Sequence, residues 1–144
     1  MATGGADFLF GMKTGNGLVL VVDDEPDIRT AVRMMLAKDG YSVLEAEDGE
    51  KAIEAINTGQ NRLMLDVIIC DIRMPKIGGA EAIAYFQKEY PRVQLIVLTG
   101  FPDTETLASF MRSGIVDYLV KPVEPEKLIA AVEKAMEQRE IHRL

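Results

Sequence analysis

Five short apolar runs alternate along the chain with five segments of helical spacing. Each run has the length of a β-strand, and in each following segment apolar residues recur every three or four positions, as on an amphipathic helix. The predicted strands are residues 18–22, 42–46, 66–70, 94–98 and 116–120. The predicted helices run from 26 to just before Gly40, over 50–57, over about 79–89, and onward from 103 and from 125.

The first helical segment carries the clearest signals. Pro26 suits a first helical turn, and Gly40 suits the position after a helix, where a positive φ is common. One apolar stripe lies between them at the spacing i, i+3, i+4, i+7, i+8: Ile28, Ala31, Val32, Met35 and Leu36. Asp48 is expected to cap the second helix in the same way that Asp103 caps the fourth.

The polarity of the strands predicts their order in the sheet. Alternating strands and helices imply parallel strands joined by right-handed crossovers. The first, third and fourth runs are almost wholly apolar, as expected when helices cover both faces, whereas the second and fifth carry Glu45 and Asp117 and suit the edges. The order 2-1-3-4-5 meets this requirement. The predicted fold is therefore α/β: a doubly wound, flavodoxin-like, five-stranded parallel sheet with helices on both faces.

Composition narrows the class of protein. A chain of 144 residues fits one domain, and its net charge of −7, with Lys and Arg scattered, argues against direct nucleic acid binding. The one cysteine, Cys70, lies inside an apolar run and indicates a buried small side chain without a disulfide. No apolar stretch is long enough to cross a membrane and no secretory signal is recognisable, so we expect a cytoplasmic protein with no membrane partner.

The two ends of the chain differ from its centre. Residues 1–17 are rich in Gly and small residues without periodicity, which predicts a flexible lead-in to a domain over 18–141. Met12 directly before Lys13 raises the suspicion that residues 1–11 are not native. The last helix continues as a polar segment over 137–143, which would suit a linker to a further output domain.

Chemically useful residues follow four of the predicted strands. Asp23 and Asp24 follow the first, Asp71 ends the third, and Thr99 and Lys121 follow the fourth and fifth. A helix cap or a turn is the ordinary role of such an Asp. In the order 2-1-3-4-5, however, the strand order reverses between the first and third strands, and ligands bind at this switch point in open α/β sheets. We therefore expect the three carboxylates to converge there.

Converging carboxylates need a cation. They repel one another and raise each other's pKa, and oxygen ligands without a His or Cys cluster favour Mg²⁺ over zinc. The hydroxyl of Thr99 and the ammonium of Lys121 are groups that a phosphoryl oxygen would contact. Because a carboxylate can itself receive a phosphoryl group, the set predicts a phosphoacceptor site.

These residues belong to motifs that stand in a recognisable order. Over about residues 18–141 the chain resembles the receiver domain of bacterial two-component response regulators, which has a chemotaxis-regulator-like fold. The resemblance rests on Val21-Val22-Asp23-Asp24-Glu25-Pro26, Cys70-Asp71-Ile72-Arg73-Met74-Pro75, Gly79, Leu98-Thr99-Gly100 and Asp117-Tyr118-Leu119-Val120-Lys121-Pro122.

The resemblance implies how phosphorylation would proceed. Asp71 would accept a phosphoryl group from a phosphohistidine of a sensor histidine kinase or a histidine phosphotransfer protein. Lys121 would contact the phosphoryl oxygens, and the Lys121–Pro122 peptide bond would be cis. Thr99 would move toward the phosphoryl group and Tyr118 would turn inward in response. This switch would bias the surface of the fourth helix, fifth strand and fifth helix toward an effector, an output domain or a homodimer.

The resemblance also implies a metal site. Mg²⁺, with Mn²⁺ as a substitute, would be bound directly by Asp24, Asp71 and the main-chain carbonyl of Arg73. Asp23 would act mainly through water. The protein would not be a conventional enzyme, although it would catalyse its own phosphorylation and dephosphorylation.

Other functions fit less well. A receiver-fold binding module that works without phosphorylation would not need the intact Asp24, Asp71, Thr99 and Lys121. A small-molecule phosphatase with an aspartate nucleophile would want an acid two residues after Asp71, where Arg73 stands.

Three further positions carry hypotheses. Gly100 stands where the family more often has Ala, and both are small. Phe101 borders the expected route of attacking water, and we expect it, with Arg73, to slow hydrolysis of an aspartyl phosphate. Glu25 is expected to cap the first helix or to face solvent.

Overall fold

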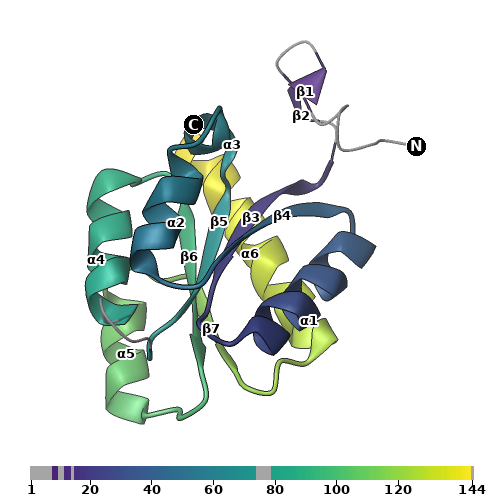
Figure 1. Ribbon diagram of the computed structural model, residues 1–144. Helices are drawn as coiled ribbons and strands as arrows, with labels where there is room; N and C mark the ends of the chain where they lie inside the picture. Colours follow the sequence, from purple (N-terminus) through teal and green to yellow (C-terminus); the bar gives the residue numbers. More distant parts are fainter. Residues whose placement is uncertain (1–7, 10–11, 14, 74–78, 144) are drawn as a thin grey trace.

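A computed structural model describes residues 8–9, 12–13, 15–73 and 79–143 (Figure 1). Its five-stranded sheet is all parallel and has the order β4-β3-β5-β6-β7, which confirms the predicted 2-1-3-4-5 topology. The strands are β3 (Gly17–Val22), β4 (Tyr41–Ala46), β5 (Val67–Asp71), β6 (Gln94–Thr99) and β7 (Asp117–Val120). All five predicted strands are confirmed to within a residue or so at their ends.

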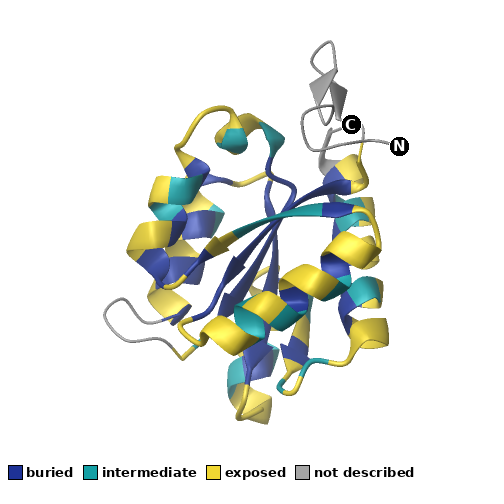
Figure 2. Ribbon diagram, turned by 45° about the vertical axis from the view of Figure 1, so that its right-hand side comes forward, coloured by how far each residue is buried: buried dark blue, intermediate teal, exposed yellow. Residues whose placement is uncertain are grey.

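Helices cover both faces of the sheet, as predicted (Figure 1). They are α1 (Pro26–Lys38), α2 (Gly49–Ile56), α3 (Asn61–Met64), α4 (Gly79–Glu89), α5 (Thr104–Arg112) and α6 (Pro125–Arg143). Because side chains alternate along a strand, one face of the sheet shares a core with α2, α4 and α5, and the other face shares a core with α1 and α6. The central strands β3, β5 and β6 are wholly buried and form the dark blue middle of the sheet in Figure 2, whereas the edge strands β4 and β7 are partly exposed.

Local signals in the sequence explain where helices begin and end. Asp48 Oδ1 accepts a hydrogen bond of 2.9 Å from the Lys51 amide, and Asp103 Oδ1 accepts one of 3.3 Å from the Glu105 amide. Gly40 follows α1 with φ +88°, a conformation that favours glycine. These contacts confirm both predicted caps and the predicted end of α1.

Gly79 allows the start of α4 to lie against the end of β5. A Cβ atom placed at this position would overlap the Cα of Ile72 and lie 2.6 Å from its carbonyl carbon. Only glycine avoids this contact with the backbone. Gly79 therefore fixes the path of the chain just after Asp71. Residues 74–78, which include the motif residues Met74 and Pro75, lie outside the described residues.

Three short elements were not predicted. β1 (Phe8–Leu9) and β2 (Met12–Lys13) pair antiparallel within the segment expected to be a flexible lead-in, and α3 follows α2. Strands of two residues and a helix of four are too short to show a period, so the pattern of apolar residues could not indicate them.

A buried ion pair ties the end of α6 to the sheet. Asp66 is fully buried and its Oδ2 accepts a hydrogen bond of 3.0 Å from the Leu18 amide. Arg139 Nε lies 3.4 Å from Asp66 Oδ1, and Arg139 Nη1 donates a 2.6 Å bond to the Arg92 carbonyl. The polar end of α6 is therefore anchored rather than free. Among the helices described, none combines the length and apolar character needed to cross a membrane.

Candidate functional site

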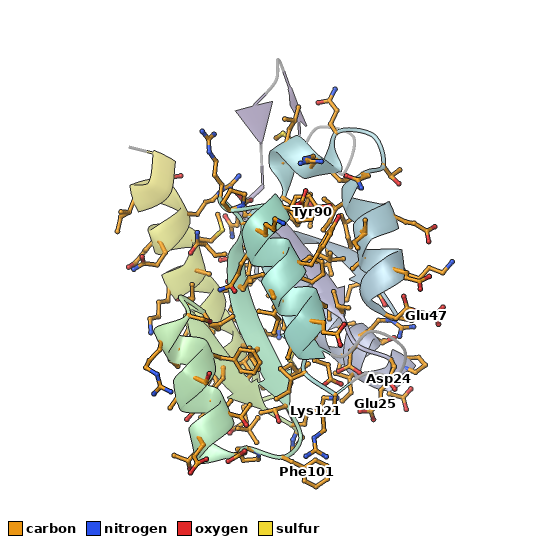
Figure 3. The ribbon with its side chains drawn as sticks, turned by 90° about the vertical axis from the view of Figure 1, so that its left-hand side faces the viewer. Asp24, Glu25, Glu47, Tyr90, Phe101 and Lys121 are labelled. Atoms are coloured by element: carbon orange, nitrogen blue, oxygen red, sulfur yellow. The ribbon has the colours of Figure 1, made fainter. Side chains whose placement is uncertain are left out.

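The carboxyl ends of the strands bring the predicted site residues to one edge of the sheet. Asp23 directly follows β3, and Asp71 ends the neighbouring strand β5. Thr99 ends β6, and Lys121 follows β7, with the Lys121 amide donating a 2.8 Å bond to the Thr99 carbonyl. The parallel register alone therefore gathers residues from four separate parts of the sequence. Figure 3 shows Asp24, another of these residues, near Lys121 at this edge.

The Lys121 ammonium lies among three carboxylates. Its Nζ is 2.8 Å from Asp23 Oδ2, 2.8 Å from Glu25 Oε1 and 3.1 Å from Asp71 Oδ2. The contacts with Glu25 and Asp71 are hydrogen bonds, and the contact with Asp23 is an ion pair. The contact between Lys121 and Asp71 brings the ammonium beside the carboxylate that is the predicted phosphoacceptor.

The acidic cluster carries more negative charge than Lys121 can neutralise. Carboxylate oxygens of Asp23, Asp24, Glu25 and Asp71 lie within 4.8 Å of one another. Asp23 and Asp71 are buried, whereas Asp24 and Glu25 are exposed. Four carboxylates against one ammonium leave an excess negative charge in a partly desolvated place, and an all-oxygen donor set suits a hard divalent cation. The residues present therefore fit Mg²⁺.

Burial and charge shift the pKa values of the central pair. Burial raises the pKa of Asp23, and neighbouring Asp71 adds to the rise, while Lys121 and the Glu25 amide oppose it. Burial alone would lower the pKa of Lys121, but its three carboxylate partners raise it above the ordinary value. Lys121 is therefore a permanent positive charge at neutral pH.

Backbone amides orient both buried carboxylates. Asp71 Oδ1 accepts a 2.9 Å hydrogen bond from the Arg73 amide, and Asp23 Oδ1 accepts a 2.8 Å bond from the Glu25 amide. The Asp23 carbonyl in turn accepts a 2.7 Å bond from Arg29 Nη1. Each carboxylate therefore has one oxygen held by the chain and one that faces Lys121. Such local bonds from a side chain to a nearby amide are typical of Asp in turns.

The predicted switch residues differ in their exposure to solvent. Thr99 is fully buried, and its Oγ1 accepts a 3.0 Å hydrogen bond from the Phe101 amide. Tyr118 is 41% exposed on the edge strand β7. The Lys121–Pro122 bond is cis, as the resemblance implied.

Phe101 and Arg73 meet beside the acidic cluster. The guanidinium carbon of Arg73 lies 4.6 Å from the centroid of the Phe101 ring, within the range of a cation–π contact. Phe101 is 66% exposed and projects at the edge that carries Lys121 (Figure 3). The contact brings together the two side chains that were expected to act jointly.

The expectation that Glu25 caps the first helix was wrong, whereas its expected exposure to solvent is confirmed. Glu25 occupies the N-cap position of α1, but its side chain makes no capping hydrogen bond. Its carboxylate instead accepts a bond from Lys121, 96 residues away in the sequence. The run of three acids before Pro26 was the one signal that could have indicated this role, because only two of them had been assigned.

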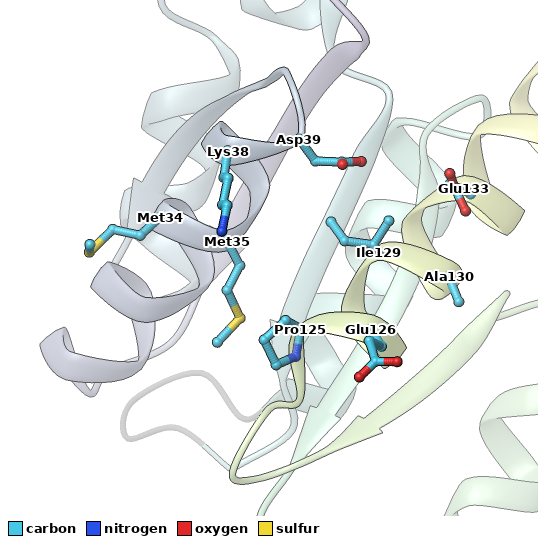
Figure 4. Close-up of a pocket in the computed structure, with 9 residues that line it drawn as sticks. All are labelled: Met34, Met35, Lys38, Asp39, Pro125, Glu126, Ile129, Ala130 and Glu133. Atoms are coloured by element: carbon cyan, nitrogen blue, oxygen red, sulfur yellow. The ribbon is translucent and has the colours of Figure 1, made fainter.

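A separate groove of about 710 Å³ lies between α1 and α6 (Figure 4). Its lining is mostly apolar and comes from the last turns of α1 and the first turns of α6, including Met34, Met35, Pro125 and Ile129. None of the residues that line it belongs to the acidic cluster. The groove contributes nothing to the chemistry of that cluster.

Comparison with known proteins agrees with the fold. Residues 19–133 match the family described as the response regulator receiver domain. The chain therefore belongs to the receiver domains of two-component response regulators.

Individual relatives support the same assignment. The chain is 37% identical over 117 residues to the CAI-1 autoinducer sensor kinase/phosphatase CqsS of Vibrio cholerae, covering 79% of this chain and 16% of that protein. It is 32% identical over 120 residues to the transcriptional regulatory protein GlrR of Escherichia coli, covering 83% and 26%. The chain thus spans about a quarter or less of these relatives.

Solved structures show the same architecture. A response regulator receiver domain protein from Clostridium thermocellum aligns with a TM-score of 0.79 and 30% identity, over 87% of this chain and 98% of that one. NtrX from Brucella abortus, solved in complex with ADP, aligns with a TM-score of 0.79 over 88% of this chain and 28% of that one.

Proposed function

We propose that this domain is a phosphorylation-dependent switch in which Asp71 accepts a phosphoryl group from a phosphohistidine. The donor would be a sensor histidine kinase or a histidine phosphotransfer protein in the cytoplasm. One observation carries the proposal: the Asp71 carboxylate lies 3.1 Å from the Lys121 ammonium inside an acidic cluster at the open edge of the sheet. Membership of the receiver family supports the same chemistry.

The transfer requires positioning and charge neutralisation more than covalent chemistry. An oxygen of Asp71 forms a bond to phosphorus, the bond between phosphorus and the histidine nitrogen breaks, and the imidazole keeps the electron pair. The Arg73 amide holds one Asp71 oxygen, and Lys121 offsets charge on the phosphoryl oxygens. Bound Mg²⁺, or Mn²⁺ in its place, would supply the remaining positive charge.

The chain offers a set of ligands for this metal. Asp24, Asp71 and the main-chain carbonyl of Arg73 would hold the ion directly, and Asp23 would act through water. The exposure of Asp24 and the pairing of buried Asp23 with Lys121 support this division of roles.

Thr99 and Tyr118 would change position in response to phosphorylation of Asp71. Thr99 would give up its bond with the Phe101 amide to contact the phosphoryl group, and the exposed Tyr118 would turn inward. The surface of α5, β7 and α6 would then present a different shape to an effector, an output domain or a second copy of the domain. This domain itself would make no direct contact with nucleic acid, given its net charge of −7.

Intact-mass measurement tests the proposal. After incubation with a small phosphodonor and Mg²⁺, the wild type should gain one phosphoryl group, and a chelator should prevent the gain. Asp71→Asn should gain none. Asp39→Asn, which changes an exposed Asp at the far end of α1, should behave as wild type.

A wild type that gains no phosphoryl group would contradict the proposal. It would favour a receiver-fold module that binds partners without phosphorylation. If Asp71→Asn gained a phosphoryl group equally well, the acceptor would be a residue other than Asp71.

A further inference from the structure

Three carboxylates surround the Lys121 ammonium before any phosphoryl group arrives. Its Nζ donates hydrogen bonds to Glu25 at 2.8 Å and to Asp71 at 3.1 Å, and it lies 2.8 Å from Asp23 Oδ2 in an ion pair. An ammonium has only three hydrogens, so a phosphoryl oxygen on Asp71 that approaches Lys121 competes with carboxylates already in contact with it. The site therefore favours an exchange of partners.

The three partners differ in how easily they can leave. The side chain of Asp23 is fully buried and that of Asp71 is 4% exposed, whereas that of Glu25 is 58% exposed. A buried carboxylate without its cation loses much of its stabilisation, while an exposed carboxylate is solvated by water as soon as it turns outward. Glu25 is thus the partner that leaves at the least cost.

The backbone around Glu25 allows its side chain to move alone. The Glu25 amide donates to Asp23 Oδ1, and its carbonyl accepts a 3.2 Å bond from the Arg29 amide in the first turn of α1. Its side chain makes no capping bond that would hold it in place. Rotation of the carboxylate away from Lys121 therefore leaves the helix start and Asp23 undisturbed.

We propose that Glu25 is a positioning residue that occupies one Lys121 donor in the unphosphorylated domain and cedes it to a phosphoryl oxygen. Glu25 competes with the incoming group for the same ammonium, so it sets how readily the site takes up a phosphoryl group. This inference rests on the proposed function of Asp71. It adds that Glu25 competes with the phosphoryl group for Lys121.

Glu25→Gln tests the competition. The amide is almost the same size but carries no charge, so it holds Lys121 more weakly. Beryllofluoride, a phosphoryl mimic, should bind this variant at saturating Mg²⁺ roughly threefold to fivefold more tightly than wild type, the range that a partly exposed ion pair supports. Titration followed by the backbone amide signals of Gly100 and Lys121 gives the affinity, and a separate Mg²⁺ titration gives the metal affinity.

Glu47→Gln is the matched control. Glu47 is an exposed acid just after β4, labelled at the same end of the molecule in Figure 3, and it is not among the carboxylates that contact Lys121. The Glu47→Gln substitution removes the same charge without freeing a Lys121 donor. The affinity of this variant for beryllofluoride should change less than about twofold, since exposed charges are largely screened.

Four results would overturn the inference. Equal tightening in both variants would mean that only general charge repulsion was removed. Weaker binding of both Mg²⁺ and beryllofluoride by Glu25→Gln would make Glu25 a metal ligand. A wild type that binds no beryllofluoride would overturn the proposed function as well, whereas normal wild-type binding with no gain in Glu25→Gln overturns this inference alone.

Discussion

Lys121 should stabilise the fold as well as serve the site, because it is the cation that faces two buried carboxylates. Its side chain is 14% exposed, and those of Asp23 and Asp71 are 0% and 4% exposed. Lys121→Met keeps the aliphatic stem but leaves these charges unpaired. Removing one partner of a buried pair costs about 3–5 kcal/mol, and we expect about 3 kcal/mol because Glu25 can turn to solvent.

The source of this loss can be isolated with a second change. Asp23→Asn removes the most deeply buried of the orphaned charges, so adding it to Lys121→Met should restore about 2 kcal/mol of the free energy of unfolding. The assay is urea unfolding at pH 7 with a chelator present. Lys127→Met, at a lysine that is 74% exposed, should change stability by no more than about 0.5 kcal/mol.

Added Mg²⁺ should stabilise Lys121→Met more than wild type, because the ion then supplies the missing positive charge. A loss below about 1 kcal/mol for Lys121→Met would refute the reasoning, since surface pairs alone have that magnitude. So would a double variant no more stable than the single one.

Three other changes test separate features of the domain. Phe101→Ala should speed loss of the phosphoryl group from the phosphorylated domain, whereas Phe101→Tyr, which keeps the ring under Arg73, should not; equal decay rates followed by intact mass would reject this role. Gly79→Ala should lower the free energy of unfolding by about 1–3 kcal/mol, because its Cβ meets the Ile72 backbone, and an unchanged urea midpoint would contradict that contact. Burial raises the pKa of the Cys70 thiol, so the unfolded chain ionises first as pH rises past about 8.5 and stability falls there. Cys70→Ala should reduce that fall, and an unchanged pH dependence of the urea midpoint would exclude this cause.

The sequence predicted the sheet because its signals were local and periodic. Strand order followed from two polar positions, Glu45 and Asp117, and strand order in turn placed Asp23 beside Asp71. Glu45 also forms ion pairs of 3.4 and 2.8 Å with Arg29 and Arg33 of α1, a pairing that no sequence period indicates.

Contacts between residues distant in sequence could not be predicted. Asp66 was placed only as the first residue of a strand, yet it is buried beside Arg139 of the last helix. Glu25 was expected to cap the first helix or to face solvent; it is exposed, but its carboxylate binds Lys121. The partner of each of these two acids depends on how the helices and strands pack together. Patterns in a single sequence indicate where a helix or strand lies, but they do not indicate which distant side chain an acid will contact.

The central claim is that the side chain of Asp71 becomes the aspartyl phosphate. Borohydride reduces an acyl phosphate to an alcohol, which turns the modified aspartate into homoserine and marks it permanently. After treatment with a phosphodonor and Mg²⁺, then borohydride, peptide mass spectrometry should find homoserine at position 71 and Asp23 and Asp24 intact. Homoserine at another position, or none in a sample that has gained a phosphoryl group, would contradict the account.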